Sequence, residues 1–169
     1  MTDATPDTSG DELPRLVGAA AAEGARAEFA LRCLLVGLLD SQYAEIVAAG
    51  VPVDTLIANC KAIASVHLDL DEQQKTKAKS FLSEIKGLMV ARNRLVHSIL
   101  AIDQSDVAGE RPEQITALYS TYQKPGRAET MSVDKAREVA EKLKTAADEL
   151  LIWTFSTLPA ASQTQVHPS

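Results

Sequence analysis

Residues 71–97 read DEQQKTKAKSFLSEIKGLMVARNRLVH, and this stretch decides the fold. Asp71 can accept a hydrogen bond from the backbone of Gln74, whose side chain can bond back to Asp71, a pattern typical of a helix start. The apolar residues that follow recur with the period of a helix and fill one arc of it. They are Ala78, Phe81, Leu82, Ile85, Leu88, Met89, Leu95, Val96 and Ile99. The pattern predicts a long amphipathic helix that continues to about Ile99 or Ile102.

The rest of the chain favours further helices around this one. Helical periodicity predicts them over about 13–39, 41–49, 54–66 and 133–155. Residues 1–12 and 158–169 are polar and aperiodic, so we expect a disordered leader and tail on either side of one domain, 13–157. The predicted fold is an all-α bundle of four to five helices, with a small β-hairpin insert over 115–131.

Composition supports this class and excludes others. The chain has 169 residues, of which 46% are hydrophobic and 4% aromatic, a balance that favours a helical domain over a sandwich or barrel. No apolar run is long enough to span a membrane and no secretory signal is visible, so we expect a cytoplasmic protein. Cys33 and Cys60 lie in apolar patterns and are expected to be reduced thiols. No metal-ligand spacing occurs, so we expect no metal and no cofactor.

Two features of the long helix are not explained by packing alone. Arg92 lies in the apolar arc, where an unpaired charge is costly. It is therefore expected either to pair with a buried acidic side chain or to line a solvated functional site. Asn93 and His97 lie four residues apart on the flank of the arc, in the same sector as Lys75, Lys79 and Lys86. The formal charge of the chain is −6, yet the segment from Lys75 to His97, both included, contains six Lys or Arg and one acidic residue. Lys75, Lys79 and Lys86 form a basic stripe, which is either an ordinary solvated face of the helix or a surface that binds a phosphodiester backbone.

The pattern Arg-Asn-x-x-x-His, at the C-terminal part of a long helix in a small bundle, resembles the HEPN family (higher eukaryotes and prokaryotes nucleotide-binding). Arg92, Asn93 and His97 carry the motif, and residues 70–155 carry the resemblance. It implies a homodimer in which two motifs meet at the interface. Many members are metal-independent ribonucleases, often toxins with a protein antitoxin or phage-defence effectors. Others are non-catalytic and bind nucleotides or partner proteins.

The residue types suit RNA cleavage. The imidazole of His97 can accept the proton of a 2′-hydroxyl, and the guanidinium of Arg92 can stabilise charge on the phosphate. Asn93 is expected to orient the ring of His97. We expect RNA contacts from Lys75, Lys79, Lys86 and Arg94.

Arg92 and His97 point ~140° apart on one helix. Two subunits are therefore expected to complete each other's site. Two alternatives remain: a non-catalytic dimer that binds nucleotide or a partner protein, and a helical interaction module in which both residues serve only the core.

Overall fold

The computed structural model describes residues 9–97, 99–100, 117–120 and 128–158. Within them the chain forms the predicted helical bundle. The helices are α1 (Ser9–Leu39), α2 (Ala44–Ala48), α3 (Val53–Val66), α4 (Glu72–Val96) and α5 (Val133–Thr157). Short strands are β1 (Ile99–Leu100), β2 (Ala117–Ser120) and β3 (Ala128–Met131). None of the described helices has the length and apolar character that a membrane span requires.

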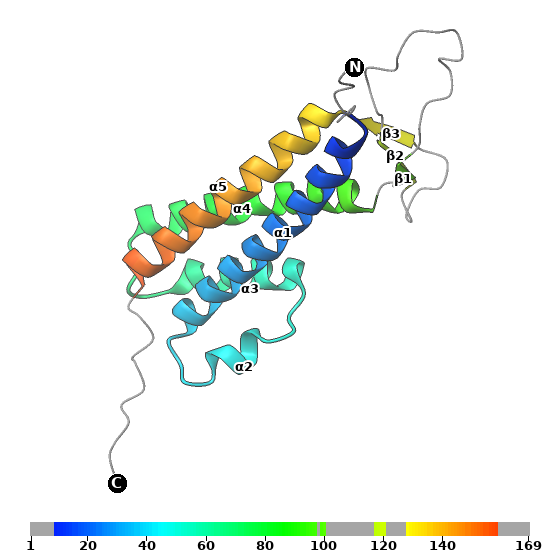
Figure 1. Ribbon diagram of the computed structural model, residues 1–169. Coiled ribbons are helices and arrows are strands. Elements are labelled where there is room, and N and C mark those ends of the chain that lie inside the picture. Colours follow the sequence, from blue (N-terminus) through cyan, green and yellow to red (C-terminus); the bar gives the residue numbers. More distant parts are fainter. Residues whose placement is uncertain (1–8, 98, 101–116, 121–127, 159–169) are drawn as a thin grey trace, which may run out of the picture.

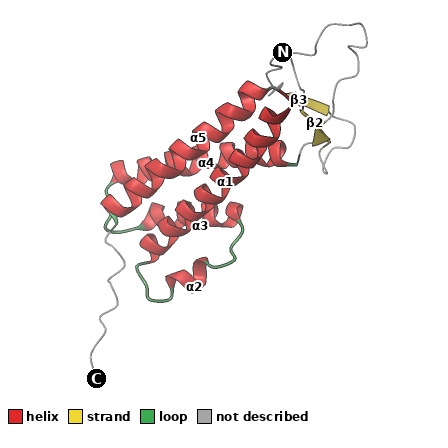
Figure 2. Ribbon diagram, viewed as in Figure 1, coloured by secondary structure: helices red, strands yellow, loops and turns green. Residues whose placement is uncertain are grey.

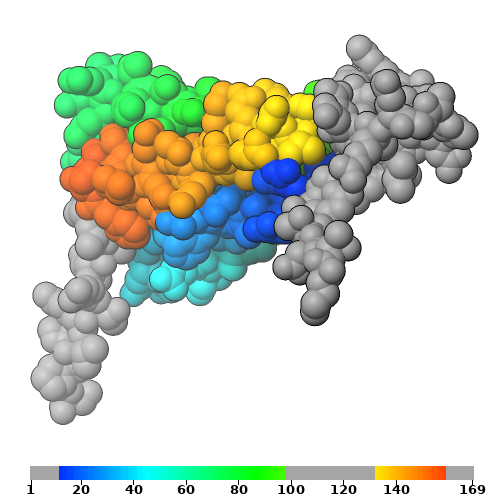
Figure 3. All heavy atoms as spheres, turned by 45° about the horizontal axis from the view of Figure 1, so that its top comes forward, coloured from blue at the N-terminus to red at the C-terminus, as the bar shows by residue number. Residues whose placement is uncertain are grey.

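The three long helices α1, α4 and α5 form the body of the bundle (Figure 1). Ion pairs join Glu12 of α1 to Arg137 of α5, and Arg26 to Asp148 further along both helices, so α1 and α5 run parallel. Figure 3 shows α5 lying along α1 at the surface. The strands gather at the end of the bundle where α4 ends and α5 begins (Figure 2).

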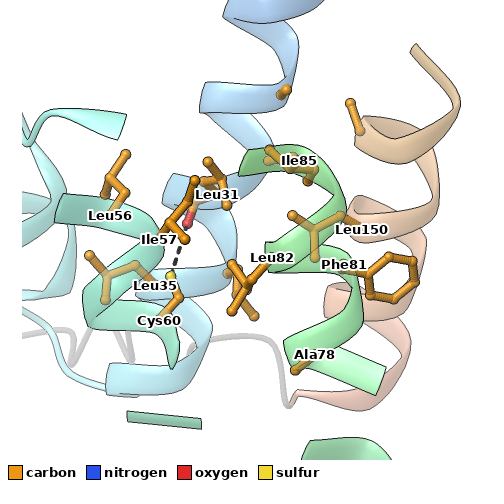
Figure 4. Packing of buried hydrophobic residues seen from close by; sticks show 14 of the residues in the cluster. Leu31, Leu35, Leu56, Ile57, Cys60, Ala78, Phe81, Leu82, Ile85 and Leu150 are labelled. Atoms are coloured by element: carbon orange, nitrogen blue, oxygen red, sulfur yellow. Dashed lines mark hydrogen bonds between the residues drawn. The ribbon is translucent and has the colours of Figure 1, made fainter. Parts of the chain in front are cut away.

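The main core lies where α3 packs on α1 and α4 (Figure 4). Leu31, Leu82 and Leu150 are fully buried there, each from a different long helix. The thiol of Cys60 on α3 donates a 3.7 Å hydrogen bond to the carbonyl oxygen of Leu31. Burial raises the pKa of Cys60 to about 12, so this thiol stays protonated. Cys33 is also free and is only half-buried.

The start of α4 follows the sequence prediction. The carboxylate of Asp71 accepts the backbone N–H of Gln74 at 2.7 Å, and the Gln74 side chain accepts the backbone N–H of Asp71 at 2.8 Å. Both halves of the predicted capping box are therefore present. This reciprocal cap defines the residue at which α4 begins.

The end of α4 corrects the prediction. The helix stops at Val96, before Ile99, because residues 99–100 form β1 and pair with β2, with Ile99 opposite Leu118. An apolar residue fits either structure, so periodicity did not reveal the change. Strands β2 and β3 pair antiparallel, with Tyr119 opposite Glu129. Residues 121–127 between them, in the middle of the expected hairpin, lie outside the described residues.

The start of α1 differs as well. The helix begins at Ser9, inside the leader expected over 1–12. Polar composition suggested disorder there, but the ion pair from Glu12 to Arg137 connects this first part of the helix to α5. A contact between residues so far apart in sequence cannot be anticipated from local composition.

Candidate functional site

The Arg-Asn-x-x-x-His motif lies at the C-terminal end of α4, at the end of the bundle next to the strands (Figure 2). A small apolar cluster holds this end in place. Its buried members come from the first half of α1, the end of α4 and the start of α5: Leu13, Ala20, Leu95, Ala136 and Ala140. Leu95 is fully buried, so the backbone that carries the motif is packed on the bundle.

Arg92 lies half-buried between α4 and α1. Its Nη1 donates a 2.9 Å hydrogen bond to the side-chain oxygen of Asn93. Its Nε is buried and has no hydrogen-bond partner among the described residues. The side chain passes Gly24 of α1 so closely that a Cβ built on that glycine would lie 2.7 Å from Nε. The guanidinium is therefore held against the α1 backbone with its outer end on Asn93.

The buried acid that could have neutralised Arg92 is not found as an ion pair in the described part of the chain. Glu23, the residue before Gly24, has a buried carboxylate oxygen, Oε2, that also lacks a hydrogen-bond partner there. Sequence reasoning missed Glu23, although an acidic residue between Ala-rich segments was a visible signal. The described residues therefore give no support to the interpretation in which Arg92 pairs with a buried acid. Its guanidinium instead donates a hydrogen bond to the exposed Asn93.

Asn93 and His97 are both exposed. The backbone N–H of His97 donates a 3.1 Å hydrogen bond to the carbonyl oxygen of Asn93, which makes His97 the C-cap of α4. Asn93 was expected to orient the imidazole, but its side-chain oxygen accepts the bond from Arg92 instead. Among the described residues no hydrogen bond joins the ring of His97 to Arg92 or Asn93. One chain therefore links two of the three motif residues and presents the third to solvent.

The expected basic stripe is present in part. Lys79 and Lys86 are exposed, and Arg94 also lies on an exposed position of α4. Lys75 differs: its ammonium pairs with Glu72 at 3.0 Å and its side chain is only 17% exposed.

A further basic residue comes from the neighbouring helix. Lys61 of α3 donates a 3.1 Å hydrogen bond to Ser83 of α4, which lies between Lys79 and Lys86 along the helix. Lys61 therefore adds positive charge beside the stripe. The sequence could not reveal this, because helix periodicity relates residues of one helix only and says nothing of two helices that pack together.

A separate cavity of about 560 Å³ opens at the far half of α1, between α1, α2 and the end of α5. Its lining is mostly apolar and includes Phe29, Cys33, Val36 and Phe155. No motif residue and no residue of the basic stripe lines it.

Within the described residues, no group of three or more His, Cys, Asp or Glu side chains gathers as a metal site would require. Comparison of the chain with protein-family models, with curated proteins and with solved structures gives no match.

Proposed function

We propose that the protein is a metal-independent endoribonuclease of the HEPN type that works as a homodimer in the cytoplasm. One observation carries the proposal: an exposed imidazole, His97, ends the same helix on which Arg92 is held against α1 and hydrogen-bonded to Asn93. The exposed Lys79 and Lys86 precede this site on α4 and supply positive charge for an RNA backbone.

The proposed reaction uses the RNA's own 2′-hydroxyl as the nucleophile. The imidazole of His97 accepts the proton of that hydroxyl, whose oxygen then attacks the adjacent phosphorus. The bond from phosphorus to the 5′ oxygen breaks, and this oxygen takes up a proton from water, while His97 later returns its proton to the solvent. The guanidinium of Arg92 stabilises the negative charge on the phosphate oxygens. The products are a 2′,3′-cyclic phosphate and a 5′-hydroxyl end.

The dimer belongs to the proposal because one chain leaves the site incomplete. Arg92 faces α1 at Gly24, whereas the ring of His97 lies at the solvent-exposed end of the helix. A two-fold arrangement of the α4 ends brings the Arg92 of one subunit to the His97 of the other. In this proposal the enzyme is a toxin or a phage-defence effector, and a protein antitoxin is the partner that would silence it.

The test is cleavage of a mixed RNA pool by the purified protein in EDTA and in MgCl₂. We expect equal cleavage in both, because the proposed chemistry uses no metal, and 2′,3′-cyclic phosphate ends on the products. RNA that stays intact in both buffers would contradict the proposed ribonuclease activity. It would favour the non-catalytic alternative, a dimer that binds nucleotide or a partner protein. Cleavage that EDTA abolishes would contradict the mechanism.

The basic stripe can be tested separately. The double change Lys79→Gln and Lys86→Gln is expected to weaken binding to single-stranded RNA and to reduce the slope of log affinity against log salt by about 0.7 for each phosphate that is no longer neutralised. Lys77→Gln is the matched control, because it removes a lysine of the same helix that is not part of the stripe. The Lys77 ammonium lies 4.5 Å from the Phe81 ring centroid, so we expect its loss to leave the slope unchanged. Filter binding at salt concentrations between about 50 and 200 mM gives both the affinity and its dependence on salt. An unchanged slope in the double variant would make the stripe an ordinary solvated face.

A further inference from the structure

Gly24 is the point at which α1 makes room for Arg92. A Cβ atom built on Gly24 would lie 2.7 Å from Nε of Arg92, 3.2 Å from Cδ and 3.3 Å from Cγ. The first distance is shorter than any ordinary non-bonded contact between carbon and nitrogen. Gly24 itself is buried in mid-helix, where glycine costs stability relative to alanine. Its presence there is explained by the space that the Arg92 side chain occupies.

Little else fixes this side chain. Nε has no hydrogen-bond partner among the described residues, and the guanidinium is hydrogen-bonded through Nη1 to Asn93. Asn93 is exposed, so this bond competes with water. The direction in which the guanidinium points therefore depends on the packing of its stem against the bare backbone at Gly24.

We propose that Gly24 is a positioning residue for Arg92, which it holds in the direction needed to contact the scissile phosphate. This inference rests on the proposed function, because it assigns Arg92 a phosphate to hold. The Cβ of an alanine at position 24 pushes Nε and Cδ outward until an ordinary contact distance is restored. The resulting shift of the guanidinium is of the order of 1 Å, which is enough to lower the rate of a positioned reaction by up to about 100-fold.

The experiment is a double-mutant cycle on cleavage of one RNA substrate, with wild type, Gly24→Ala, Arg92→Ala and the double variant. We expect Gly24→Ala to lower kcat by about 10- to 100-fold with little change in KM. In the Arg92→Ala background the same change is expected to have almost no further effect, because Nε, Cδ and Cγ, the atoms that met the new Cβ, are all gone. A role of Gly24 in folding alone would lower activity equally in both backgrounds.

Two other glycines provide matched controls. Gly18 on α1 and Gly87 on α4 have nothing within 4 Å of an added Cβ. Gly18→Ala and Gly87→Ala are therefore expected to raise the melting temperature by about 2–4 °C and to leave kcat unchanged. If Gly24→Ala behaves like these two controls, or if its effect adds fully to that of Arg92→Ala, the inference is wrong.

A spectroscopic measurement separates this inference from the proposed function. In ¹⁵N-labelled protein the Nε–H signal of Arg92 reports the buried position directly, whether or not the protein cleaves RNA. Gly24→Ala is expected to shift that signal and to speed its exchange with water, and Gly18→Ala is expected to do neither. Wild-type protein that cleaves no RNA but shows this difference would overturn the proposed function and keep the packing role of Gly24. An unchanged signal in Gly24→Ala would overturn the inference itself.

Discussion

Replacing His97 with alanine is expected to lower the rate of RNA cleavage by about 10²–10⁴-fold, the usual contribution of a general base. The fold should survive, because His97 is exposed and its hydrogen bond to α4 uses the backbone N–H, which alanine keeps. The measurement is kcat on a short RNA, with the helical circular dichroism signal recorded on the same samples.

A second histidine offers a matched control for His97→Ala. His67 is the C-cap of α3, and its Nδ1 accepts the backbone N–H of Asp69 at 3.3 Å. His67→Ala removes an imidazole from the end of a helix just as His97→Ala does, but at a place without the motif. We expect it to leave kcat unchanged. Wild-type activity in His97→Ala, or an equal loss in His67→Ala, would remove His97 from the mechanism.

The second large effect is expected from Arg92→Ala, which should lower kcat by about 10²–10³-fold because it removes the group that stabilises transition-state charge. Arg94→Ala is the control for removal of a neighbouring positive charge. We expect that variant to raise KM with kcat unchanged, since Arg94 is assigned to RNA binding. Equal losses of kcat in both variants would mean that general charge, and not the position of Arg92, is responsible.

Mixing the two inactive proteins tests the shared site. If Arg92 of one subunit acts with His97 of the other, a heterodimer of Arg92→Ala and His97→Ala contains one intact site and one empty site. Random exchange makes about half the dimers mixed, so the mixture should recover about a quarter of wild-type activity. The readout is the cleavage rate against mixing ratio after subunit exchange. A mixture no more active than its parents would contradict the two-subunit site.

The sequence predicted those features of the fold that depend on residues close together along the chain. The Asp71 and Gln74 capping box and the buried face of α4 follow from hydrogen-bonding groups and periodicity within a few residues. The end of α4 did not follow, because Val96 and Ile99 suit a helix and a strand equally. The pairing of residues 99–100 with β2 decides between them, and that contact is distant in sequence.

The site was predictable to the same extent. The sequence showed that Arg92 stands out in an apolar arc and that Asn93 and His97 flank it. It did not show that Asn93 bonds to Arg92, that Lys75 pairs with Glu72, or that Gly24 lies under the guanidinium. The contact between Gly24 and Arg92 joins two helices that are far apart in sequence, so only the packing of the helices reveals it.

The unequal burial of the two cysteines makes the chain suited to a distance measurement without any engineered residue. A spin-label reagent meets Cys33 first, because Cys60 is fully buried and its pKa is raised to about 12. Partial burial also raises the pKa of Cys33, so mildly alkaline buffer should speed its labelling. The label would lie in the apolar cavity at the far half of α1, remote from the motif. In a two-fold assembly the pair of labels yields one characteristic separation, and binding of RNA or of the proposed antitoxin could be followed as a change in that separation.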